Sequence, residues 1–331
     1  MRLIKNTSTD TFFNMAAEEY FLTTVTEPLV MLWRNARTVV IGRNQNALQE
    51  VNADFVKQNN IDVVRRLTGG GAVFHDLGNI NFTVIQRHEA GLYQNYEYFT
   101  APVCEYLQSL NVNACFAGRN DLLIEGRKFS GNAQVVLGKN IMHHGTIMFN
   151  ANVSELVGAL KPNPLKISSK SIKSVQARVT NVAEHLSTSL SADEFYEQLL
   201  GAFAERGYKL TSISPEEQQQ INNLADSKYR TWDWNFGRAP NYSLTKEKLF
   251  DFGIVQVQLD ISKGLIVDIK IYGDFFGILD IRELTTKLRG VRYNREGVCQ
   301  ALQDVLLGEY ISGMSKQQLV DLLMEEVEHG Q

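Results

Sequence analysis

The chain has 331 residues, and 33 lysines and arginines against 37 acidic residues give it a formal net charge of −4. Hydrophobic residues make up 44% and charged residues 21%, which excludes a disordered or collagen-like chain. The slightly acidic balance does not favour nucleic acid or an anionic membrane as the main partner.

Three cysteines and the N-terminal residues bear on the compartment. The cysteines show no C-x-x-C spacing, so neither a disulfide framework nor a zinc knuckle is supported: Cys104, Cys115 and Cys299. The first residues lack the apolar core of a signal peptide, and no later stretch has the length of a membrane span. We therefore expect a soluble protein of the reducing cytoplasm.

Apolar spacing predicts helices and strands in mixed order through the first half of the chain. Helical spacing predicts a first helix from about Thr11, a second at 53–59 and a third that contains residues 99–110. Apolar runs and alternation predict strands at 29–33, 38–41, 61–66, 80–86, 121–125, 128–136 and 141–150. This order is not a regular series of βαβ units, so a mixed α/β body is expected.

Capping residues and turns organise the second half. Ser191 with Glu194 forms a capping box, and Ser214 followed by Pro215 begins another helix. Between the halves, residues 161–178 hold four lysines and one arginine without an acid, and we expect a loop there.

A domain boundary is expected near residue 245, which divides the chain into residues 1–245 and 246–331. Beyond it, alternation at 255–261 and 265–271 predicts a hairpin. Two helices, capped by Asn294 and Ser315, are expected to close the chain.

The segment 65–79 concentrates the residues of an anion site between two predicted strands. Gly69, Gly70 and Gly71 remove every Cβ over one turn, so a ligand can approach the backbone N–H groups. Arg65 and Arg66 directly before them carry forked charges that suit phosphate or carboxylate. The alternative is a tight turn with a solvated arginine pair, and neither the P-loop nor the G-x-G-x-x-G pattern is present.

Two further clusters follow. In the segment 120–133, the ammonium of Lys128 is placed to stabilise negative charge near small residues, although a surface hairpin with Lys128 in water is the alternative. His143 and His144 are adjacent on a predicted strand, so they point to opposite faces and do not chelate one metal. One is expected at the site and the other in the core or in solvent.

Together the clusters resemble the lipoate–protein ligase A family in the same order along essentially the whole chain. The matching motifs are Ile41–Asn46, Arg66 with Thr68–Asn79, Asn120–Asp121 with Gly126–Ala133, His144–Thr146, and Arg178–Asn181. Phe129 stands where the family commonly has an aliphatic residue. The resemblance implies an α+β fold, with a mixed-sheet catalytic domain like that of biotin and lipoate ligases (class II synthetase-like) and a smaller C-terminal α/β accessory domain.

The resemblance also implies an activity. ATP and Mg²⁺ would activate lipoate to lipoyl-AMP with release of pyrophosphate, and the lipoyl group would pass to a lysine of an acceptor lipoyl domain. Such acceptors are the E2 subunits of 2-oxoacid dehydrogenases or the glycine cleavage H protein. Neither nucleic acid nor a membrane is implied as a partner.

The implied site residues follow from the motif positions. Lys128 is the implied catalytic residue, and Asp121 is the implied Mg²⁺ ligand. The implied nucleotide contacts are Arg66, Gly71, Ala72, Val73, Phe74, Asp121, Lys128 and Thr146. The implied lipoate contacts are Arg66, Gly70, His75, Lys128, His144 and Gly145. The basic loop 161–178 becomes a candidate lid over the adenylate.

Three other functions fit these residues less well. An acyltransferase of the same fold would use a cysteine nucleophile, but Cys104 and Cys115 lie outside the motifs. A biotin ligase has a different glycine motif. A non-catalytic binding protein is disfavoured because every charged motif position is present.

Overall fold

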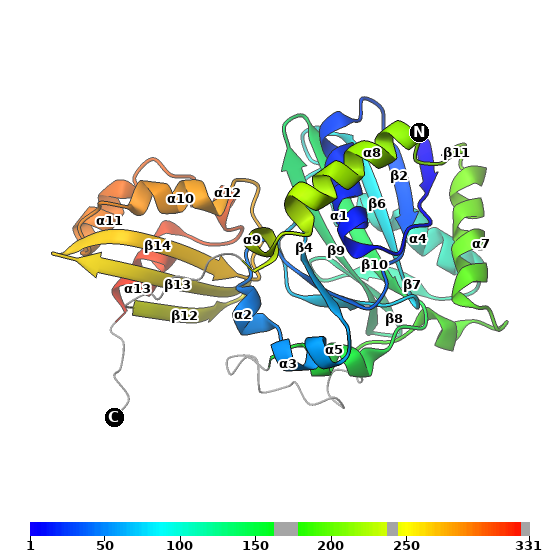
Figure 1. Ribbon diagram of the computed structural model, residues 1–331, viewed down its shortest axis with the longest axis horizontal. Coiled ribbons are helices and arrows are strands. Elements are labelled where there is room, and N and C mark those ends of the chain that lie inside the picture. Colours follow the sequence, from blue (N-terminus) through cyan, green and yellow to red (C-terminus); the bar gives the residue numbers. More distant parts are fainter. Residues whose placement is uncertain (162–177, 237–243, 326–331) are drawn as a thin grey trace.

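The computed structural model describes residues 1–161, 178–236 and 244–325, and it shows a large mixed-sheet body beside a smaller sheet domain (Figure 1). Strand β1 is parallel to both of its neighbours in the central sheet, whereas all other neighbours are antiparallel. In spatial order the strands of this sheet are β11 (Lys209–Thr211), β1 (Arg2–Lys5), β2 (Leu29–Trp33), β6 (Asn79–Arg87), β10 (Asn140–Met148), β9 (Arg127–Leu137), β8 (Asp121–Ile124) and β7 (Ala114–Ala117). The predicted α+β class is confirmed.

Helices cover both faces of the central sheet because its inner strands are apolar on both sides. Val30 and Leu32 of β2 pack in one core cluster, while Met31 and Trp33 pack in the other, as alternation along a strand requires. The helices are α4 (Tyr96–Ser109) and α7 (Ala192–Glu205) on the first face, and α1 (Thr11–Thr24) and α8 (Pro215–Leu224) on the second.

A second, three-stranded sheet lies against the α1 side of the body. It consists of β4 (Asp62–Arg65), β3 (Thr38–Ile41) and β5 (Val73–His75). Val40 joins the cluster of α1, whereas Val39 and Ile41 join a separate cluster on the other side. The glycine loop, residues 66–72, connects β4 to β5 and is thereby held at the edge of this sheet.

Short helical segments complete the body. They are α2 (Ala47–Glu50), α3 (Ala53–Gln58), α5 (Val153–Ala159), the 3₁₀ segment η2 (Val182–His185), the π-helical segment η3 (Ala225–Tyr229) and α9 (Trp232–Asn235). None of the helices in the described ranges is both long enough and apolar enough to cross a membrane.

The C-terminal domain has its own core, in which helices pack on a three-stranded antiparallel sheet. Its strands are β12 (Leu244–Phe250), β13 (Gly253–Ser262) and β14 (Leu265–Gly273), and its helices are α10 (Ile281–Leu288), α11 (Arg295–Ala301), α12 (Leu307–Tyr310) and α13 (Lys316–Met324). Lys263 and Gly264 have φ values of 52° and 74°, as in the two-residue turn of a twisted hairpin.

Elements with a strong local signal lie where the sequence predicts them. The capping boxes at Ser191, Ser214 and Ser315 begin α7, α8 and α13. The prediction of two closing helices was incomplete, since four helices follow β14 in the described residues. The missed helices α10 and α12 have only eight and four residues. The missed strand β12 is an edge strand rich in lysine, which gives little local signal.

Candidate active site

A cavity of about 420 Å³ lies between the glycine loop, strands β9 and β10, helix α1 and the turns of the C-terminal sheet, a volume that suits a small ligand. All but one of the site residues predicted from the sequence line this cavity: Arg66, Gly70, Gly71, Ala72, Val73, His75, Asp121, Lys128, His144, Gly145 and Thr146. The exception is Phe74, whose side chain packs in the core cluster behind the loop.

Arg66 fixes the shape of the glycine loop from within. Its buried guanidinium donates to the carbonyls of Gly69 and Gly71 at 2.7 and 2.8 Å and to the Thr68 hydroxyl at 2.9 Å. Burial lowers the pKa of Arg66 to about 10, so it keeps its charge at neutral pH. Gly70 has a φ of +93°, which favours glycine, and a Cβ on Gly42 would lie 2.0 Å from the Gly70 carbonyl oxygen.

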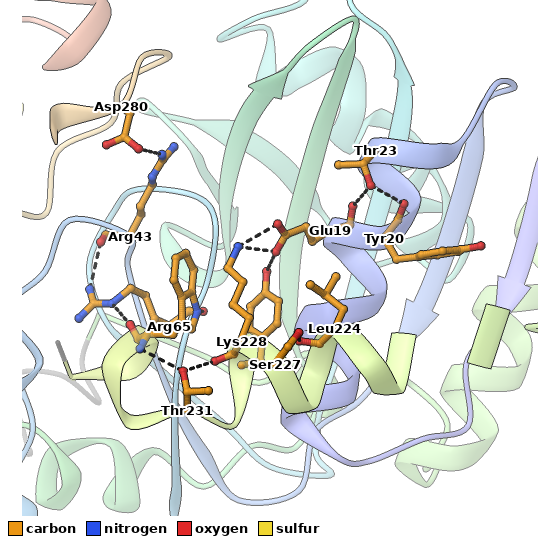
Figure 2. Close-up of polar contacts among 12 residues, drawn as sticks. Glu19, Tyr20, Thr23, Arg43, Arg65, Leu224, Ser227, Lys228, Thr231 and Asp280 are labelled. Atoms are coloured by element: carbon orange, nitrogen blue, oxygen red, sulfur yellow. Dashed lines mark hydrogen bonds and ion pairs between the residues drawn. The ribbon is translucent and has the colours of Figure 1, made fainter. Parts of the chain in front are cut away.

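Arg65 does not belong to the anion site, which corrects the interpretation of the arginine pair. Its guanidinium donates to the carbonyls of Gly42 and Gln45 on one side and to those of Trp234 and Asn235 on the other. Adjacent residues at the end of a strand point in opposite directions, so Arg65 is directed at α9 while Arg66 faces the loop. Figure 2 shows Arg65 in this polar network, next to Arg43.

Lys128 lies at the mouth of the cavity, where its ammonium is 2.7 Å from Oδ1 of Asp121. The two side chains are 39% and 35% exposed, so a ligand can reach both. Nothing else in the described residues pairs with this ammonium.

A β-bulge sets the direction of the Lys128 side chain. Leu122 pairs with Ser130 and Leu123 pairs with Lys128, so Phe129 is the extra residue of β9 and is fully buried. Without the bulge, residues three apart on a strand would face opposite sides. With it, Lys128 and Gly131 both line the cavity, and a Cβ on Gly131 would lie 3.0 Å from the lysine Nζ.

The motif that follows the basic loop holds the backbone of Lys128. The Lys128 amide donates to the carbonyl of Arg178 at 2.8 Å, and the amide of Thr180 donates to the Lys128 carbonyl at 2.9 Å. The predicted adenylate lid at 161–178 lies outside the described residues except for its two end residues.

The two adjacent histidines separate as predicted. His144 lines the cavity, where Nδ1 is 2.9 Å from Oε1 of buried Glu18 and Nε2 is 2.8 Å from the Thr68 hydroxyl. His143 is fully buried and stacks on Phe99 with a centroid distance of 4.9 Å. Burial holds the pKa of His143 well below its usual range, so it is neutral.

His75 also lines the cavity and is neutral, because burial lowers its pKa to about 3 with help from the charge of Arg66. Its Nδ1 is 3.1 Å from the amide nitrogen of Asn35. Asn35 and Glu18 were not predicted as site residues. Asn35 lies between Arg34 and Ala36, and Glu18 is followed by Glu19, so no short-range pattern distinguishes either residue from its neighbours.

The C-terminal domain supplies one wall of the cavity. The wall residues are Leu249, Phe250, Asp251, Phe252, Gly253, Asp274 and Phe276. The Gly70 amide contacts the Phe275 carbonyl at 3.4 Å, and the Gly273 amide donates to the Asn44 carbonyl at 2.7 Å. A 2.8 Å ion pair between Arg43 and Asp280 also joins the two domains (Figure 2).

Three carboxylates of the described chain line the cavity, those of Asp121, Asp251 and Asp274, and Asp121 is the one beside Lys128. Among the described residues, no group of three or more His, Cys, Asp or Glu side chains could hold a metal by itself. Mg²⁺ with a nucleotide usually takes one or two carboxylates and completes its shell with phosphate oxygens and water. Asp121 at the open mouth of the cavity fits that requirement, with Lys128 as its present partner.

Sequence comparisons match both parts of the chain. Residues 10–204 match the family model of the lipoyl protein ligase A/B catalytic domain, and residues 239–323 match that of the bacterial lipoate protein ligase C-terminus. The chain is 40% identical over 327 residues to lipoate–protein ligase 1 of Staphylococcus aureus, covering 98% of this chain and 100% of the relative. It is 38% identical over 323 residues to the lipoate-protein ligase LplJ of Bacillus subtilis, covering 95% and 97%.

Solved structures of similar fold agree with this result. The structure of P. falciparum LipL1 in complex with lipoate has a TM-score of 0.77 at 27% identity, covering 92% of this chain and 94% of that chain. A lipoate-protein ligase A bound with ATP has a TM-score of 0.62 at 27% identity, covering 71% and 98%. A bipartite lipoate protein ligase from Thermoplasma acidophilum, studied with its E2 lipoyl domain, has a TM-score of 0.64 at 28% identity, covering 73% and 98%.

Proposed function

Because the chain belongs to the lipoate–protein ligase A family, with its catalytic domain and its bacterial C-terminal domain, we propose that it activates lipoate with ATP and then lipoylates acceptor domains. The observation that carries the proposal is the placement of Lys128 and Asp121 at the mouth of a cavity whose floor is the glycine loop.

The first half-reaction forms lipoyl-AMP. A carboxylate oxygen of lipoate attacks the α-phosphorus of ATP, the bond from that phosphorus to the bridging oxygen breaks, and pyrophosphate leaves with the electron pair. Both reactants are anions, so their approach needs fixed positive charge. Lys128 supplies it at the mouth, and Arg66 adds a charge behind the loop, where its donors are committed to loop carbonyls.

The glycine loop and its neighbours receive the nucleotide. Arg66 holds the loop in place through its hydrogen bond to the Gly71 carbonyl. A Cβ on Gly71 would meet no atom within 4 Å, so there is room for a ligand beside the backbone at this position. Ala72, Val73 and the backbone of Phe74 continue the proposed nucleotide contacts. Thr146 accepts a hydrogen bond from the Gly131 amide at 3.1 Å and thereby closes the same corner.

Mg²⁺ is proposed at Asp121. When bound with the triphosphate, it would neutralise phosphate charge and polarise the phosphoryl oxygens. Asp121 would hold the ion, and the ammonium of Lys128, which now pairs with Asp121, would then be free to face the reacting oxygens.

Lipoate is proposed to enter the cavity with its carboxylate at Lys128 and its chain toward the buried end. Gly70, His75, His144 and Gly145 would line its path, and the apolar side chains of Met15, Trp33 and Val40 provide a dry wall. A Cβ on Gly145 would lie 2.1 Å from Oδ1 of Asn132, so glycine is required there.

In the second half-reaction, the amine of an acceptor lysine attacks the carbonyl carbon of lipoyl-AMP. The new amide bond forms as the carbon–oxygen bond to AMP breaks, and the amine loses a proton. The acceptors proposed are lipoyl domains of E2 subunits or of the glycine cleavage H protein. Residues 1–245 are proposed as the catalytic unit and residues 246–331 as the accessory unit that walls the cavity.

The described structure gives no support to an acyl-cysteine route. Neither Cys104 nor Cys115 lines the cavity. Burial raises the pKa of the Cys104 thiol to about 11, which suppresses the reactive thiolate at neutral pH.

The test is lipoate-dependent release of pyrophosphate from ATP, followed by a mass gain on an apo lipoyl domain. Both signals are expected to need ATP, lipoate and Mg²⁺ together. An acceptor whose target lysine is replaced by arginine is the control and should gain no mass. If the wild-type acceptor also stays unmodified while the protein is folded, the proposed function is wrong.

A further inference from the structure

Two buried side-chain nitrogens in the cavity wall have no hydrogen-bond partner in the described residues. They are Nε2 of His75 and Nδ2 of Asn81, and the two residues are only 3% and 1% exposed. A buried polar group without a partner costs about 1–3 kcal/mol, so native proteins rarely keep one without a use. Two of them on one cavity indicate that a ligand supplies an acceptor.

These nitrogens belong to the buried side of the cavity, since Asn81 of β6 pairs with Trp33 of β2 and lies two strands from β9, which carries Lys128. The charged mouth, at Lys128 and Asp121, has side chains that are 39% and 35% exposed. The inner wall is dry by comparison, since Met15 and Trp33 are 2% and 1% exposed. The ring of Trp33 contacts that of His75 edge-on, at a centroid distance of 6.1 Å.

A row of buried amides fixes which nitrogen of His75 carries the proton. The amide nitrogen of Asn14 donates to the backbone carbonyls of Ser8 and Arg34 at 3.0 and 2.9 Å, so its orientation cannot be reversed without placing oxygen against oxygen. The same nitrogen lies 2.9 Å from Oδ1 of Asn35, which shares one of its two hydrogens. An amide nitrogen has no acceptor lone pair, so a reversed Asn35 would place two donors against each other. Asn35 must therefore turn its nitrogen toward His75.

The consequence is a single tautomer. Nδ1 of His75 accepts from Asn35 at 3.1 Å and carries no hydrogen. The neutral ring then has its proton on Nε2, the atom that lacks a partner. His75 is thus preset as a donor by residues of α1 and of the turn after β2.

We propose that His75 and Asn81 form a donor subsite that recognises the sulfur-bearing end of the acyl group and so selects lipoate over an unsubstituted fatty acid of the same chain length. This inference rests on the proposed function. With its carboxylate at Lys128, lipoate has acceptors at its far end only in the two ring sulfurs. Octanoate has the same eight-carbon chain and presents hydrocarbon to both donors.

The size of the preference follows from the unmet donors. Sulfur is a weak hydrogen-bond acceptor, so it offsets part of the free-energy cost of the two buried donors. An alkyl chain accepts no hydrogen bond and leaves that cost unchanged. We expect kcat/KM for adenylation to be about tenfold higher with lipoate than with octanoate, and the difference to lie mainly in KM. Asn35 acts through His75 and is a positioning residue.

The sharpest variant is Asn35→Asp, which keeps the shape of the side chain and replaces the donor with an acceptor. At pH 8 the new carboxylate accepts a hydrogen bond from Nδ1 of His75, so the single ring proton moves to Nδ1 and Nε2 is left without hydrogen. The ratio of kcat/KM for lipoate to that for octanoate should fall to about one, with octanoate affected least. Asn294→Asp makes the same chemical change at the exposed cap of α11 and should leave the ratio unchanged.

The tautomer is checked separately by long-range ¹H–¹⁵N spectra of the wild-type protein labelled in histidine. The resonance of His75, assigned with a His75→Gln variant, should show a protonated Nε2 and a bare Nδ1. A proton on Nδ1 would overturn the inference even if Asn35→Asp does not fold. So would equal wild-type kinetics with the two acids, or an unchanged ratio in folded Asn35→Asp.

Failure of the proposed function gives a different result. In that case neither acid supports release of pyrophosphate by the wild-type protein at any concentration. If both acids are activated and only their ratio contradicts the expectation, the ligase function stands and the donor subsite is rejected.

Discussion

Lys128 and its surroundings show how a single residue is placed for chemistry. Its backbone is held by Arg178 and Thr180, its direction is set by the bulge at Phe129, and its ammonium rests on Asp121. The ion pair is partly exposed, so it adds only about 0–1 kcal/mol to stability. Its position at the cavity mouth is therefore better explained by function than by folding.

Replacing Lys128 with alanine should leave the fold intact and lower kcat/KM for lipoyl-AMP formation by about 10²–10³, the usual loss for one group that stabilises transition-state charge. The measurement is lipoate-dependent pyrophosphate release, with circular dichroism to check the fold. Lys139→Ala removes an exposed lysine from the turn after β9 and should retain full activity. Activity of Lys128→Ala within a few-fold of wild type would remove Lys128 from the catalytic role.

The two buried neutral histidines make stability depend on pH. Burial lowers the pKa of His75 to about 3, whereas the unfolded chain titrates near 6.5. The contribution of neutral His75 to the free energy of unfolding is therefore complete above pH 6.5 and is lost as the pH falls toward 3. Between pH 7 and pH 5 this amounts to about 2 kcal/mol for one such group, and His143 acts in the same direction.

This dependence is measured by urea unfolding at pH 7, 6 and 5. A His143→Gln variant, which leaves the cavity untouched, should lose roughly half as much stability over this range as the wild-type protein. His88→Gln, at an exposed position, should show the wild-type dependence. If the free energy of unfolding depends on pH equally in His143→Gln and in the wild-type protein, His143 is not a buried neutral histidine.

At the scale of elements, a chain of hydrogen bonds links helix α1, strand β10 and the glycine loop. Oε1 of Glu18 receives the Thr83 hydroxyl at 2.6 Å and lies 2.9 Å from Nδ1 of His144. Nε2 of His144 contacts the Thr68 hydroxyl at 2.8 Å, and that hydroxyl accepts from Arg66. The loop is thus positioned by a helix that is far from it in sequence.

Glu18→Gln should weaken this link because an amide replaces one acceptor oxygen with a donor. We expect KM for lipoate to rise about tenfold with a smaller fall in kcat, and the free energy of unfolding to drop by about 1–3 kcal/mol. Glu19→Gln is the matched control, since Glu19 pairs with Lys228 and Tyr229 away from the cavity (Figure 2). Glu19→Gln should lower the free energy of unfolding and leave KM for lipoate unchanged. If KM for lipoate rises equally in Glu18→Gln and Glu19→Gln, Glu18 has no specific part in positioning the loop.

Across the whole molecule, the C-terminal domain closes the cavity against the glycine loop. A Cβ on Gly69 would lie 2.3 Å from the Phe275 carbonyl oxygen, so close contact between the domains depends on glycine there. The cross-domain ion pair joins Arg43 to Asp280, which also caps α10. We propose that the C-terminal domain changes orientation during the catalytic cycle, since interfaces between domains of one chain commonly allow such motion.

Arg43→Gln should loosen the two domains because it removes the cross-domain ion pair and leaves the α10 cap in place. The expected result is a larger radius of gyration in X-ray scattering and a several-fold higher KM for ATP, whose site would lose part of one wall. Arg289→Gln breaks an ion pair within the C-terminal domain and is the control. Unchanged scattering and KM in Arg43→Gln would show that this contact does not set the domain orientation.

Local chemistry was sufficient to predict much of this protein. The order of the motifs identified the family, and caps and alternation predicted most helices and strands, because those signals act over a few residues. The family resemblance assigned Lys128 and the glycine loop to the site, because the residues alone left a solvated lysine and a tight turn as alternatives. Helix α10 has an N-cap at Asp280 and apolar residues at helical spacing, so its local signal was overlooked. The short helix α12 and the edge strand β12 have weak local signals, and their place depends on the core of their domain.

The sequence by itself determined the residue types of the site and the order in which they occur, since charge, glycine content and spacing are local properties. Only the tertiary structure decided that Arg65 and Arg66 point in opposite directions. It also decided that Glu18 and Asn35 contact the histidines of the cavity, and that the C-terminal domain forms one wall of it. These facts depend on contacts between residues far apart in the chain, where burial and hydrogen-bond partners are set by packing.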